Sequence, residues 1–467
     1  MAFLTILASL VFLMFVAYRG YSVILFAPIA AMGAVFLTDP NLVAPMFTGL
    51  FMDKMVVFVK LYFPIFLLGA IFGKVIELAG FAKSIVNSVI RLIGRERAIL
   101  AITLACILLT YGGVSVFVVV FAVYPFAAEM FKAGAIPKRL IPGTIALGSF
   151  TISMDAFPGT PQIQNVIPTT FFKTTIYAAP WLGIIGGTLI VIAGLAYLEW
   201  VRRQAMAAGE GYGEGHINEP EPFDDTHERL PNPFIAILPL VMVAVANKIF
   251  TEVIPQFYGE SHQFVPAVIG KVSPVVQKIA AVKAIWAVEA ALLVGIACVL
   301  IFAFKPVITR FAEGSKAAIA GSLLASINTA SEYGYGSVIA ALPGFLVIAE
   351  ALKTIPNPLI NEAITVTTLA GIVGSASGGL GIALAAMSDL FIANANAAGI
   401  PLEVMHRVAS MASGGMDSLP HNGAVITLLA VTGLTHRQSY KDIFAITILK
   451  TIGVFVVIGI YYATGIV

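Results

Sequence analysis

The sequence predicts an all-α polytopic membrane protein built from two related halves. Three observations support this prediction: the composition, the spacing of long apolar runs, and motifs that recur at a nearly constant interval. Hydrophobic residues make up 59% of the 467 residues and charged residues 11%, whereas about a quarter of a soluble globular chain is charged. The formal net charge of +2 argues against a nucleic-acid partner. The two cysteines, Cys106 and Cys298, fall in apolar runs and predict neither a disulfide framework nor a metal cluster.

Apolar runs recur along the chain at lengths that approach or exceed the roughly 18 residues of a membrane-spanning helix. The uninterrupted runs are residues 2–18, 22–38, 55–72, 98–111, 114–131, 176–200, 233–250, 283–304 and 444–465. Further runs, at about 140–172 and 316–434, are interrupted by Gly, Pro and polar residues, and are compatible with full spans or re-entrant hairpins. We expect about 10 to 14 membrane segments. The first run lacks a basic leader, so we expect a retained span rather than a signal peptide.

One stretch, residues 201–232, is soluble in composition. Between Arg202 and Pro231 the chain is rich in Gly, Pro and acidic residues and has no helical periodicity. We expect a flexible loop that joins the two halves and has no specific binding role. The pair Arg202 and Arg203, directly after a span, favours a cytoplasmic position for this loop.

An internal repeat relates the two halves. The landmarks and their counterparts are Phe72-Gly73 and Tyr335-Gly336, Gly112-Gly113 and Gly378-Gly379, Ile136-Pro137 and Ile400-Pro401, Met154-Asp155 and Met416-Asp417, and Tyr177 and Tyr440, at offsets of 262 to 266 residues. Five landmarks in one order indicate a duplicated membrane unit. Matching Gly- and Pro-interrupted segments in each half are typical of secondary transporters, with the binding site where the broken helices meet. Backbone that leaves a helix inside a bilayer costs several kcal/mol for each unpaired group, unless protein, water or a solute pairs with it.

The first pair of matched elements predicts hairpin tips. The candidate substrate-binding residues here are Tyr111, Gly112, Gly113 and Ser115 in the first half, and Ser375, Ser377, Gly378 and Gly379 in the second. Glycine allows left-handed backbone and close approach of a solute, and serine adds a hydroxyl. The alternative is close helix packing through small residues.

The second pair predicts broken helices at residues 153–165 and 414–425. Pro158, Pro161 and Pro420 prevent regular helix there. Candidate polar partners are Gln162, Gln164 and Asn165 in the first half, and His421 and Asn422 in the second. Asp155 and Asp417 are carboxylates inside the membrane by context, and such groups are functional hypotheses by default. Asp155, Asp417 or His421 could carry a coupled proton; the alternative is that the aspartates cap helices or pair structurally.

A third polar element has no counterpart in the first half. It contains the candidate substrate-binding residues Ser326, Asn328 and Thr329, together with Ser331 and Glu332. Ser326, Thr329 and Tyr333 share one helical face. Glu332 is a candidate for ion coupling, with a surface position at a helix end as the alternative.

Three isolated acidic residues are weaker candidates. For Glu77 and Glu289, in apolar or amphipathic helices, we expect interhelical hydrogen bonds. Asp389 follows the second tip by ten residues and is a minor candidate for flanking the site.

The motifs together resemble a known family. "LLGAIFGKVIELAG", "TYGGVSVFVVVFAVYPFA", "PGTPQIQNVIPT", and "GSASGGLGIAL" followed by "SGGMDSLPHNGAV" are similar to the gluconate permease (GntP) family of bacterial organic-acid symporters, and closest to its hydroxybutyrate permease-like branch. The resemblance implies membership of the ion transporter superfamily: two inverted repeats with re-entrant hairpins and broken helices, a scaffold domain and a moving transport domain. It also implies a homodimer in the bacterial cytoplasmic (inner) membrane and an elevator mechanism.

This resemblance gives a division of the chain. We expect N-terminal transmembrane helices at 1–50, a first repeat at 51–200, the connecting loop at 201–232, scaffold helices at 233–312 and a second repeat at 313–467. One departure concerns the substrate. Sugar-acid members carry an "HPGP"-like stretch where this chain has Phe157-Pro158-Gly159-Thr160-Pro161, which argues for a smaller, less hydroxylated acid.

The predicted function is symport of a small organic-acid anion, such as 3-hydroxybutyrate or gluconate, with protons. No lysine or arginine falls in the matched motifs, so we expect helix dipoles and a co-transported cation to balance the anion. Sodium near Asn328 and Ser375 is the second choice of ion. A sodium/proton antiporter, a channel and an intramembrane hydrolase are the other hypotheses; the sequence has neither HExxH nor GxSxG, so we expect no enzyme and no cofactor.

Overall fold

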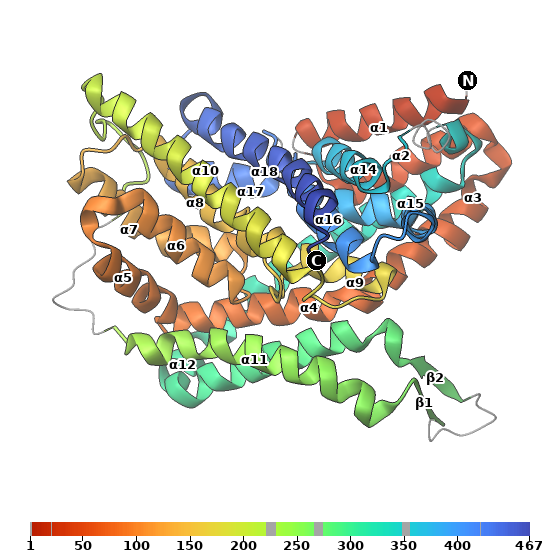
Figure 1. Ribbon diagram of the computed structural model, residues 1–467, viewed down its shortest axis with the longest axis horizontal. Helices are drawn as coiled ribbons and strands as arrows, with labels where there is room; N and C mark the ends of the chain where they lie inside the picture. Colours follow the sequence, from red (N-terminus) through yellow and green to blue (C-terminus); the bar gives the residue numbers. More distant parts are fainter. Residues whose placement is uncertain (1, 20, 221–229, 266–273, 348–354, 421) are drawn as a thin grey trace.

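The computed structural model describes residues 2–19, 21–220, 230–265, 274–347, 355–420 and 422–467. These ranges are helical apart from connecting segments and a small β-hairpin, in which β1 (Ser261–Phe264) pairs antiparallel with β2 (Val275–Lys278). The hairpin projects from one end of the molecule (Figure 1). In the described part of the chain, 6 helical segments are long and apolar enough to cross a membrane, and shorter apolar helices accompany them. The prediction of a polytopic helical membrane protein is confirmed.

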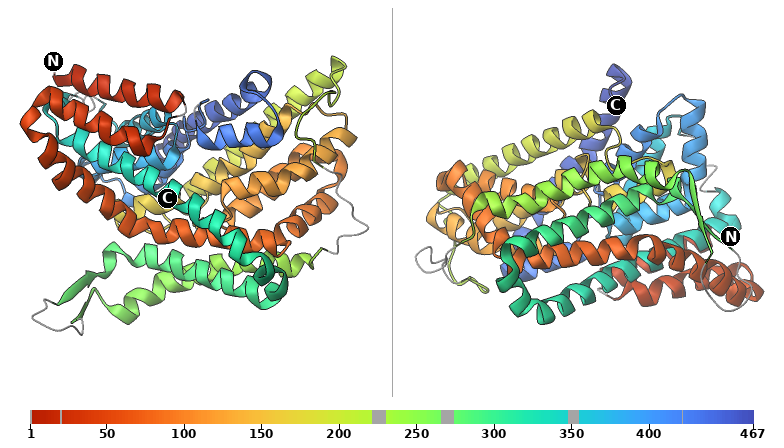
Figure 2. Two further views of the ribbon diagram at one scale, coloured as in Figure 1. Left: turned by 180° about the vertical axis from the view of Figure 1, so that it is seen from behind. Right: turned by 90° about the horizontal axis from the view of Figure 1, so that it is seen from below.

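Three long helices lie along one side of the molecule (Figure 1): α4 (Asp53–Leu78), α11 (Pro233–Tyr258) and α12 (Lys283–Ala341). The chain leaves helical geometry inside α12 at Ala303 (φ −137°, ψ 39°), three residues before Pro306. Proline cannot donate the helical hydrogen bond and clashes with the preceding turn, so the chain bends there and turns back (Figure 2). The predicted domain boundary at 312/313 therefore falls inside a helix, beyond this bend.

The N-terminal helices cover one end of the structure (Figure 1). α1 (Ala2–Tyr18) packs on α2 (Val23–Thr38), and the short α3 (Val43–Met46) leads toward α4. α2 and α1 also contact α12 and α14, respectively. Tyr335 of α12 joins this group through its hydroxyl, 3.2 Å from the hydroxyl of Ser9. The run expected as the first span is thus a helix packed on the body of the protein.

One order of elements occurs twice along the chain. After α5 (Phe81–Ile93) come the hairpin of α6 (Ala98–Tyr111) and α7 (Val116–Ala133), the interrupted helix of α8 (Leu140–Ser149) and α9 (Ile163–Phe172), and the long α10 (Pro180–Ala207). After α12 come the hairpin of α14 (Pro358–Val373) and α15 (Ala376–Ala397), the interrupted helix of α16 (Leu402–Ser413) and α17 (Gly423–Thr432), and the long α18 (His436–Thr464).

The interrupted helices interlock the two halves. α9, in the first half, packs against α15 and α16, and α17, in the second half, packs against α7 and α8. The long helices α10 and α18 also pack on each other (Figure 1). As a result, the breaks lie in the interior of the molecule, next to elements of the opposite half; they are residues 150–162 in the first half and residues 414–420 and 422 in the second.

The connecting loop begins later than expected, and its described part contacts the body of the protein. α10 continues to Ala207, so the predicted boundary at 200/201 falls inside a helix. Lys138, two residues before α8, is buried and binds the carbonyl oxygen of Ile217 at 3.0 Å and a carboxylate oxygen of Glu219 at 2.6 Å. Arg139 forms an ion pair with Glu210 at 2.7 Å. Residues 208–219 are therefore docked on the body of the protein, and residues 221–229 lie outside the described ranges.

Candidate functional site

A buried lysine links the aspartates of the two breaks. The ammonium nitrogen Nζ of Lys450, on α18, lies 3.0 Å from Oδ1 of Asp417 and 3.9 Å from Oδ2 of Asp155. The three side chains are 3% to 6% exposed. Ser418 donates a second hydrogen bond to Asp417, at 2.8 Å. A Cβ atom at Gly414 would collide with the Asp155 carboxylate, so glycine is needed for this approach. The two predicted carboxylates thus meet at one charge centre, formed by Asp155, Asp417 and Lys450.

The partners of the two aspartates differ. Asp417 accepts hydrogen bonds from Lys450 and Ser418. Oδ2 of Asp155 accepts none among the described residues, and its contact with Lys450 is the longer of the two. A buried ion pair gains little over the cost of desolvation unless its remaining oxygens are also hydrogen-bonded. Asp155 is therefore the less well stabilised carboxylate of the charge centre.

A second buried cation, Arg407 of α16, binds backbone carbonyl groups of the first half, in the break and in the segment between α9 and α10. It is 0% exposed. Its Nε and Nη2 donate to the carbonyl oxygen of Ala178 at 3.1 and 2.8 Å, and Nη2 also donates to that of Ile176 at 3.4 Å. Its Nη1 donates to the carbonyl oxygen of Asp155 at 3.3 Å and to Oδ1 of Asn165 at 3.1 Å. Freed carbonyl groups suit a cation, and here the cation belongs to the protein.

Asn165 connects the first interrupted helix to α16. Its Nδ2 donates to the carbonyl oxygens of Thr160 at 3.0 Å and Ile176 at 2.8 Å, so its Oδ1 is the acceptor for Arg407 and for Nε2 of His406 at 3.1 Å. If the imidazole is neutral, Nδ1 of His406 then accepts a hydrogen bond from Oγ1 of Thr174, at 2.7 Å. Asn165 was predicted to bind substrate, but in this structure its amide is used by the protein.

An amide side chain from each break holds the tip of the adjacent hairpin. Nε2 of Gln162 donates to the carbonyl oxygens of Thr110 at 2.8 Å and Val114 at 3.3 Å. In the second half, Nδ2 of Asn422 donates to the carbonyl oxygen of Gly374 at 2.8 Å. Both residues precede the second part of their interrupted helix. The amides thus add hydrogen bonds to carbonyl groups at both turns; the carbonyl of Thr110 also accepts from the backbone N–H of Gly113, at 3.0 Å.

The first hairpin tip has the predicted residues. The turn lies at 112–115 between α6 and α7, and Gly113 has a φ of +97°, which favours glycine. Ser115 precedes the first residue of α7. The hydroxyl of Tyr111 donates to the carbonyl oxygen of Pro158 at 2.9 Å. A Cβ atom on Gly112 would clash with Leu240 of α11, so this glycine also serves helix packing.

The second hairpin turns earlier than predicted. The turn lies at Gly374 and Ser375, and Gly378 and Gly379 lie in the first turn of α15. The repeat was aligned there four residues out of register, and the assignment of these two glycines to the tip is wrong. A Cβ atom on Gly379 would collide with the backbone of Ala370 in α14. Close helix packing, the alternative reading, explains Gly379.

The polar element of α12 lies against α15. Glu332 is 1% exposed, so the alternative of a surface position is wrong. Oγ1 of Thr329 lies 3.3 Å from Oγ of Ser377. Ser326 is buried, and its hydroxyl has no hydrogen-bond partner among the described residues. Asn328 is half-buried.

Three other positions named in the sequence analysis can be compared with the structure. Glu77 pairs with Lys74 one turn earlier at 2.7 Å, which replaces the interhelical hydrogen bond expected of it. Asp389 is exposed on α15. His421 lies outside the described residues.

Sequence reasoning missed Arg407, His406 and Lys450. Lys450 falls within the apolar run at 444–465, and a charge there was a usable signal, because charged residues inside spans are rare and usually functional. Two buried cations, Arg407 and Lys450, lie beside the breaks, and the sequence analysis did not foresee them.

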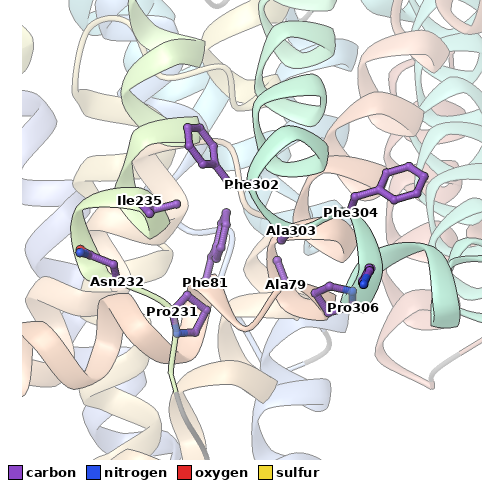
Figure 3. Close-up of a pocket in the computed structure, with 10 residues that line it drawn as sticks. Ala79, Phe81, Pro231, Asn232, Ile235, Phe302, Ala303, Phe304 and Pro306 are labelled. Carbon is purple, nitrogen blue, oxygen red and sulfur yellow. The ribbon is translucent and has the colours of Figure 1, made fainter.

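A surface pocket lies away from the two breaks. It has a volume of about 460 Å³. Mainly apolar residues line it, where α4 leads into α5, at the start of α11 and at the bend of α12. Among them are Phe81, Pro231, Ile235, Phe302 and Pro306 (Figure 3). None of its lining residues belongs to the charge centre.

The fold and the buried charge centre between interrupted helices define a multi-pass membrane transporter. No family model matches the chain. The chain is 57% identical over 474 residues to the "Uncharacterized transporter YxjC" of Bacillus subtilis (strain 168), and the alignment covers 100% of both proteins. The chain therefore belongs to the family of this transporter.

A solved structure supports the fold. The chain resembles the crystal structure of the YdaH transporter of Alcanivorax borkumensis with a TM-score of 0.55 over 92% of this chain and 90% of that chain, at 15% sequence identity. At this identity the likeness concerns the fold alone. The prediction of a membrane transporter rather than an enzyme is confirmed by the 57% identity to the Bacillus subtilis transporter.

Proposed function

We propose that the protein is a secondary active symporter that imports a small organic-acid anion together with protons. The observation that carries the proposal is Lys450, which stands between an aspartate from each break, 3.0 Å from Asp417 and 3.9 Å from Asp155. A charged residue placed there inside the molecule costs several kcal/mol unless it is paired. Charged residues inside membrane segments are rare and usually functional, so we assign this arrangement a part in transport.

Charge balance supports proton coupling. Arg407 and Lys450 carry two positive charges beside the breaks, and ionised Asp155 and Asp417 carry two negative charges. A monocarboxylate that enters this site adds one negative charge, and an unbalanced buried charge is costly. One proton on an aspartate restores neutrality. Asp155 is our choice for this proton, because Asp417 has two hydrogen-bond donors whereas Oδ2 of Asp155 has none among the described residues.

The substrate carboxylate would lie between the hairpin tips and the breaks. Positive helix ends and free N–H groups favour an anion, and both interrupted helices begin their second part here. We keep as candidate contacts Tyr111, Gly112, Gly113 and Ser115 at the first tip, Ser377 in the first turn of α15, and Gln162 and Asn422 beside the tips. A bound acid would compete with the protein for the amide groups of the last two.

The wider scheme is part of the same proposal. Two inverted repeats, a scaffold domain with a moving transport domain, an elevator motion, a homodimer and the bacterial inner membrane are what the GntP resemblance implies. The twofold order of hairpin, interrupted helix and long helix is compatible with such repeats. A short hydroxy- or keto-monocarboxylate such as 3-hydroxybutyrate is the first choice of substrate, because no histidine lies in the first break; gluconate is the second.

Uptake into proteoliposomes tests the proposal. Purified protein would be reconstituted and supplied with labelled 3-hydroxybutyrate or gluconate, with an inward pH gradient or an inward sodium gradient imposed separately. We expect accumulation of the acid with the pH gradient, and loss of accumulation in Asp155→Asn. Accumulation with neither gradient would contradict symport.

Two rivals give different results in this assay. Accumulation with the sodium gradient alone would favour a sodium-coupled carboxylate symporter. Sodium–proton exchange without any organic acid, followed with a pH-sensitive dye inside the vesicles, would favour an antiporter.

A further inference from the structure

Glu332 is a buried carboxylate that the charge centre does not use. It lies on α12, is 1% exposed, and neither of its carboxylate oxygens has a hydrogen-bond partner among the described residues. A Cβ atom built on Gly378 would collide with the carboxylate of Glu332. The carboxylate is therefore pressed against the first turn of α15, and it reaches that position because Gly378 has no side chain.

Three hydroxyl groups belong to the same parts of α12 and α15. Thr329 is one helical turn before Glu332 on the same face of α12, and its Oγ1 lies 3.3 Å from Oγ of Ser377. Oγ of Ser377 lies 3.5 Å from Oγ of Ser375. Ser375 accepts a hydrogen bond from the backbone N–H of Gly378, at 3.1 Å, which places its hydroxyl at the residue that Glu332 contacts. The group thus consists of a carboxylate and three hydroxyl oxygens from two elements.

The spacing of the hydroxyl oxygens does not suit hydrogen bonds between them. Good O–H···O bonds have oxygen separations of about 2.7–2.8 Å, and the separations of 3.3 and 3.5 Å are longer. Oxygen ligands of Ca²⁺ lie at roughly 2.3–2.6 Å, and Na⁺ has nearly the same ionic radius. Neighbouring corners of an octahedron with a metal–oxygen distance of about 2.4 Å are about 3.4 Å apart. The two measured separations match this value.

We propose that Glu332, Thr329, Ser375 and Ser377 form a monovalent-cation site between α12 and the hairpin of α14 and α15, and that sodium binds there. A single carboxylate with neutral hydroxyl ligands suits one positive charge better than two. An ionised carboxylate without a partner is costly inside a protein, and a bound cation removes this cost. The site is separate from the charge centre, where Lys450 supplies the positive charge.

The placement of the ligands gives the site a role. Glu332 and Thr329 belong to α12, and Ser375 and Ser377 belong to the start of α15. A cation bound by both elements ties the hairpin to α12, and separation of the two elements dismantles the site. This role in holding the hairpin rests on the proposed transport function, whereas binding of sodium does not.

The test measures binding without a substrate. The thermal midpoint of the full-length protein in detergent would be measured at pH 7.5 in NaCl, KCl and choline chloride of equal ionic strength. We expect a saturable rise of at least about 2 °C with sodium only. Glu332→Gln and Ser377→Ala should abolish the rise, and Glu77→Gln, a control on the exposed part of α4, should keep it. Asp417→Asn should also keep it, because the charge centre is a different site.

Each outcome decides the proposal. Equal midpoints in sodium and choline for the unaltered protein overturn it, and so does a sodium response that survives in both Glu332→Gln and Ser377→Ala. A midpoint that follows pH through Glu332 but ignores sodium also overturns it and assigns a proton to this carboxyl. Ser377→Ala keeps the test decisive if Glu332→Gln does not fold. Failure of acid uptake with an intact sodium response would count against the proposed function and leave this site standing.

Discussion

The ammonium group of Lys450 lies 3.0 Å from the carboxylate of Asp417, 33 residues earlier in the chain, with both side chains at most 6% exposed. The contact joins α18 to the break between α16 and α17. The same ammonium group lies 3.9 Å from Asp155 in the other half. One cation therefore connects both breaks, and its removal affects both halves at once.

Replacement of this cation should destabilise the protein strongly. Lys450→Met leaves Asp417 and Asp155 as buried carboxylates without a cation, and breaking a buried pair typically costs about 3–5 kcal/mol. The thermal midpoint in detergent and acid uptake should both fall. The control is Lys441→Met, at an exposed position on the same helix, which should change neither by much. Equal midpoints for the two variants would mean that the buried pair contributes nothing to stability.

Removal of the proposed proton carrier should abolish proton-driven uptake of the acid but leave exchange of the acid intact. Asp155→Asn keeps the size of the side chain and the positive charge of Lys450, but it cannot take up a proton. We expect this variant to exchange labelled for unlabelled acid across the vesicle membrane and to lose uphill uptake driven by a pH gradient. Uphill uptake at the normal level would exclude Asp155 as the proton carrier.

Two glycine substitutions should have opposite effects on the stability of the protein. A Cβ atom at Gly379 would collide with the backbone of Ala370, so Gly379→Ala should force α14 and α15 apart and cost about 1–3 kcal/mol. Gly321, on α12, has no atom within 4 Å of the position of a new Cβ. Gly321→Ala should stabilise the helix by up to about 1 kcal/mol. Thermal midpoints measured side by side check the pair, and a neutral Gly379→Ala would contradict the observed packing.

The amide of Gln162 should stabilise the first hairpin tip. Gln162→Leu removes the amide donor to the carbonyl of Val114 and the second donor to that of Thr110, which keeps the backbone N–H of Gly113. An unsatisfied buried group costs about 1–3 kcal/mol. Hydrogen exchange at residues 110–115 should become faster. Gln204→Leu, at an exposed position near the end of α10, is the control and should leave exchange at the tip unchanged. Unchanged exchange in Gln162→Leu would mean that the turn is held by other contacts.

The docked loop should respond to acid through Glu210. The guanidinium of Arg139 hydrogen-bonds Glu210 and lowers the pKa of its carboxyl below the usual value. A lowered folded-state pKa contributes stability above the unfolded pKa of about 4.3, and this contribution disappears as the pH falls through the folded-state pKa. The pair is 29% and 42% exposed, so solvent screening keeps the contribution below about 1 kcal/mol.

Thermal midpoints between pH 7 and pH 3.5 measure this effect. The unaltered protein should be slightly more stable than Glu210→Gln at pH 7, and the difference should shrink toward pH 3.5. Glu214→Gln, in the same loop, serves as the control. A difference that grows on acidification would contradict the sign derived from the Arg139 contact.

Much of the fold was predictable because it depends on local pattern. The apolar runs at 2–18, 22–38 and 98–111 correspond to α1, α2 and α6, since a bilayer-spanning segment must pair its own backbone groups. The prolines and glycines near Asp155 and Asp417 located both breaks, because proline removes the helical donor wherever it stands. The second hairpin tip was misplaced at Gly378, since nothing local distinguishes a glycine in a turn from one that admits Glu332.

The sequence by itself determined that this is a membrane protein with two matched breaks, because composition, hydrophobic length and proline placement act within each segment. Only the tertiary structure decided which charges meet. Lys450 and Arg407 lie outside the matched motifs, and each finds its partners through packing of helices distant in the chain. Burial makes these pairings obligatory, since a charge away from water must be neutralised or hydrogen-bonded by whatever the fold brings to it. Which groups the fold brings there is a property of three-dimensional packing, not of any single stretch of sequence.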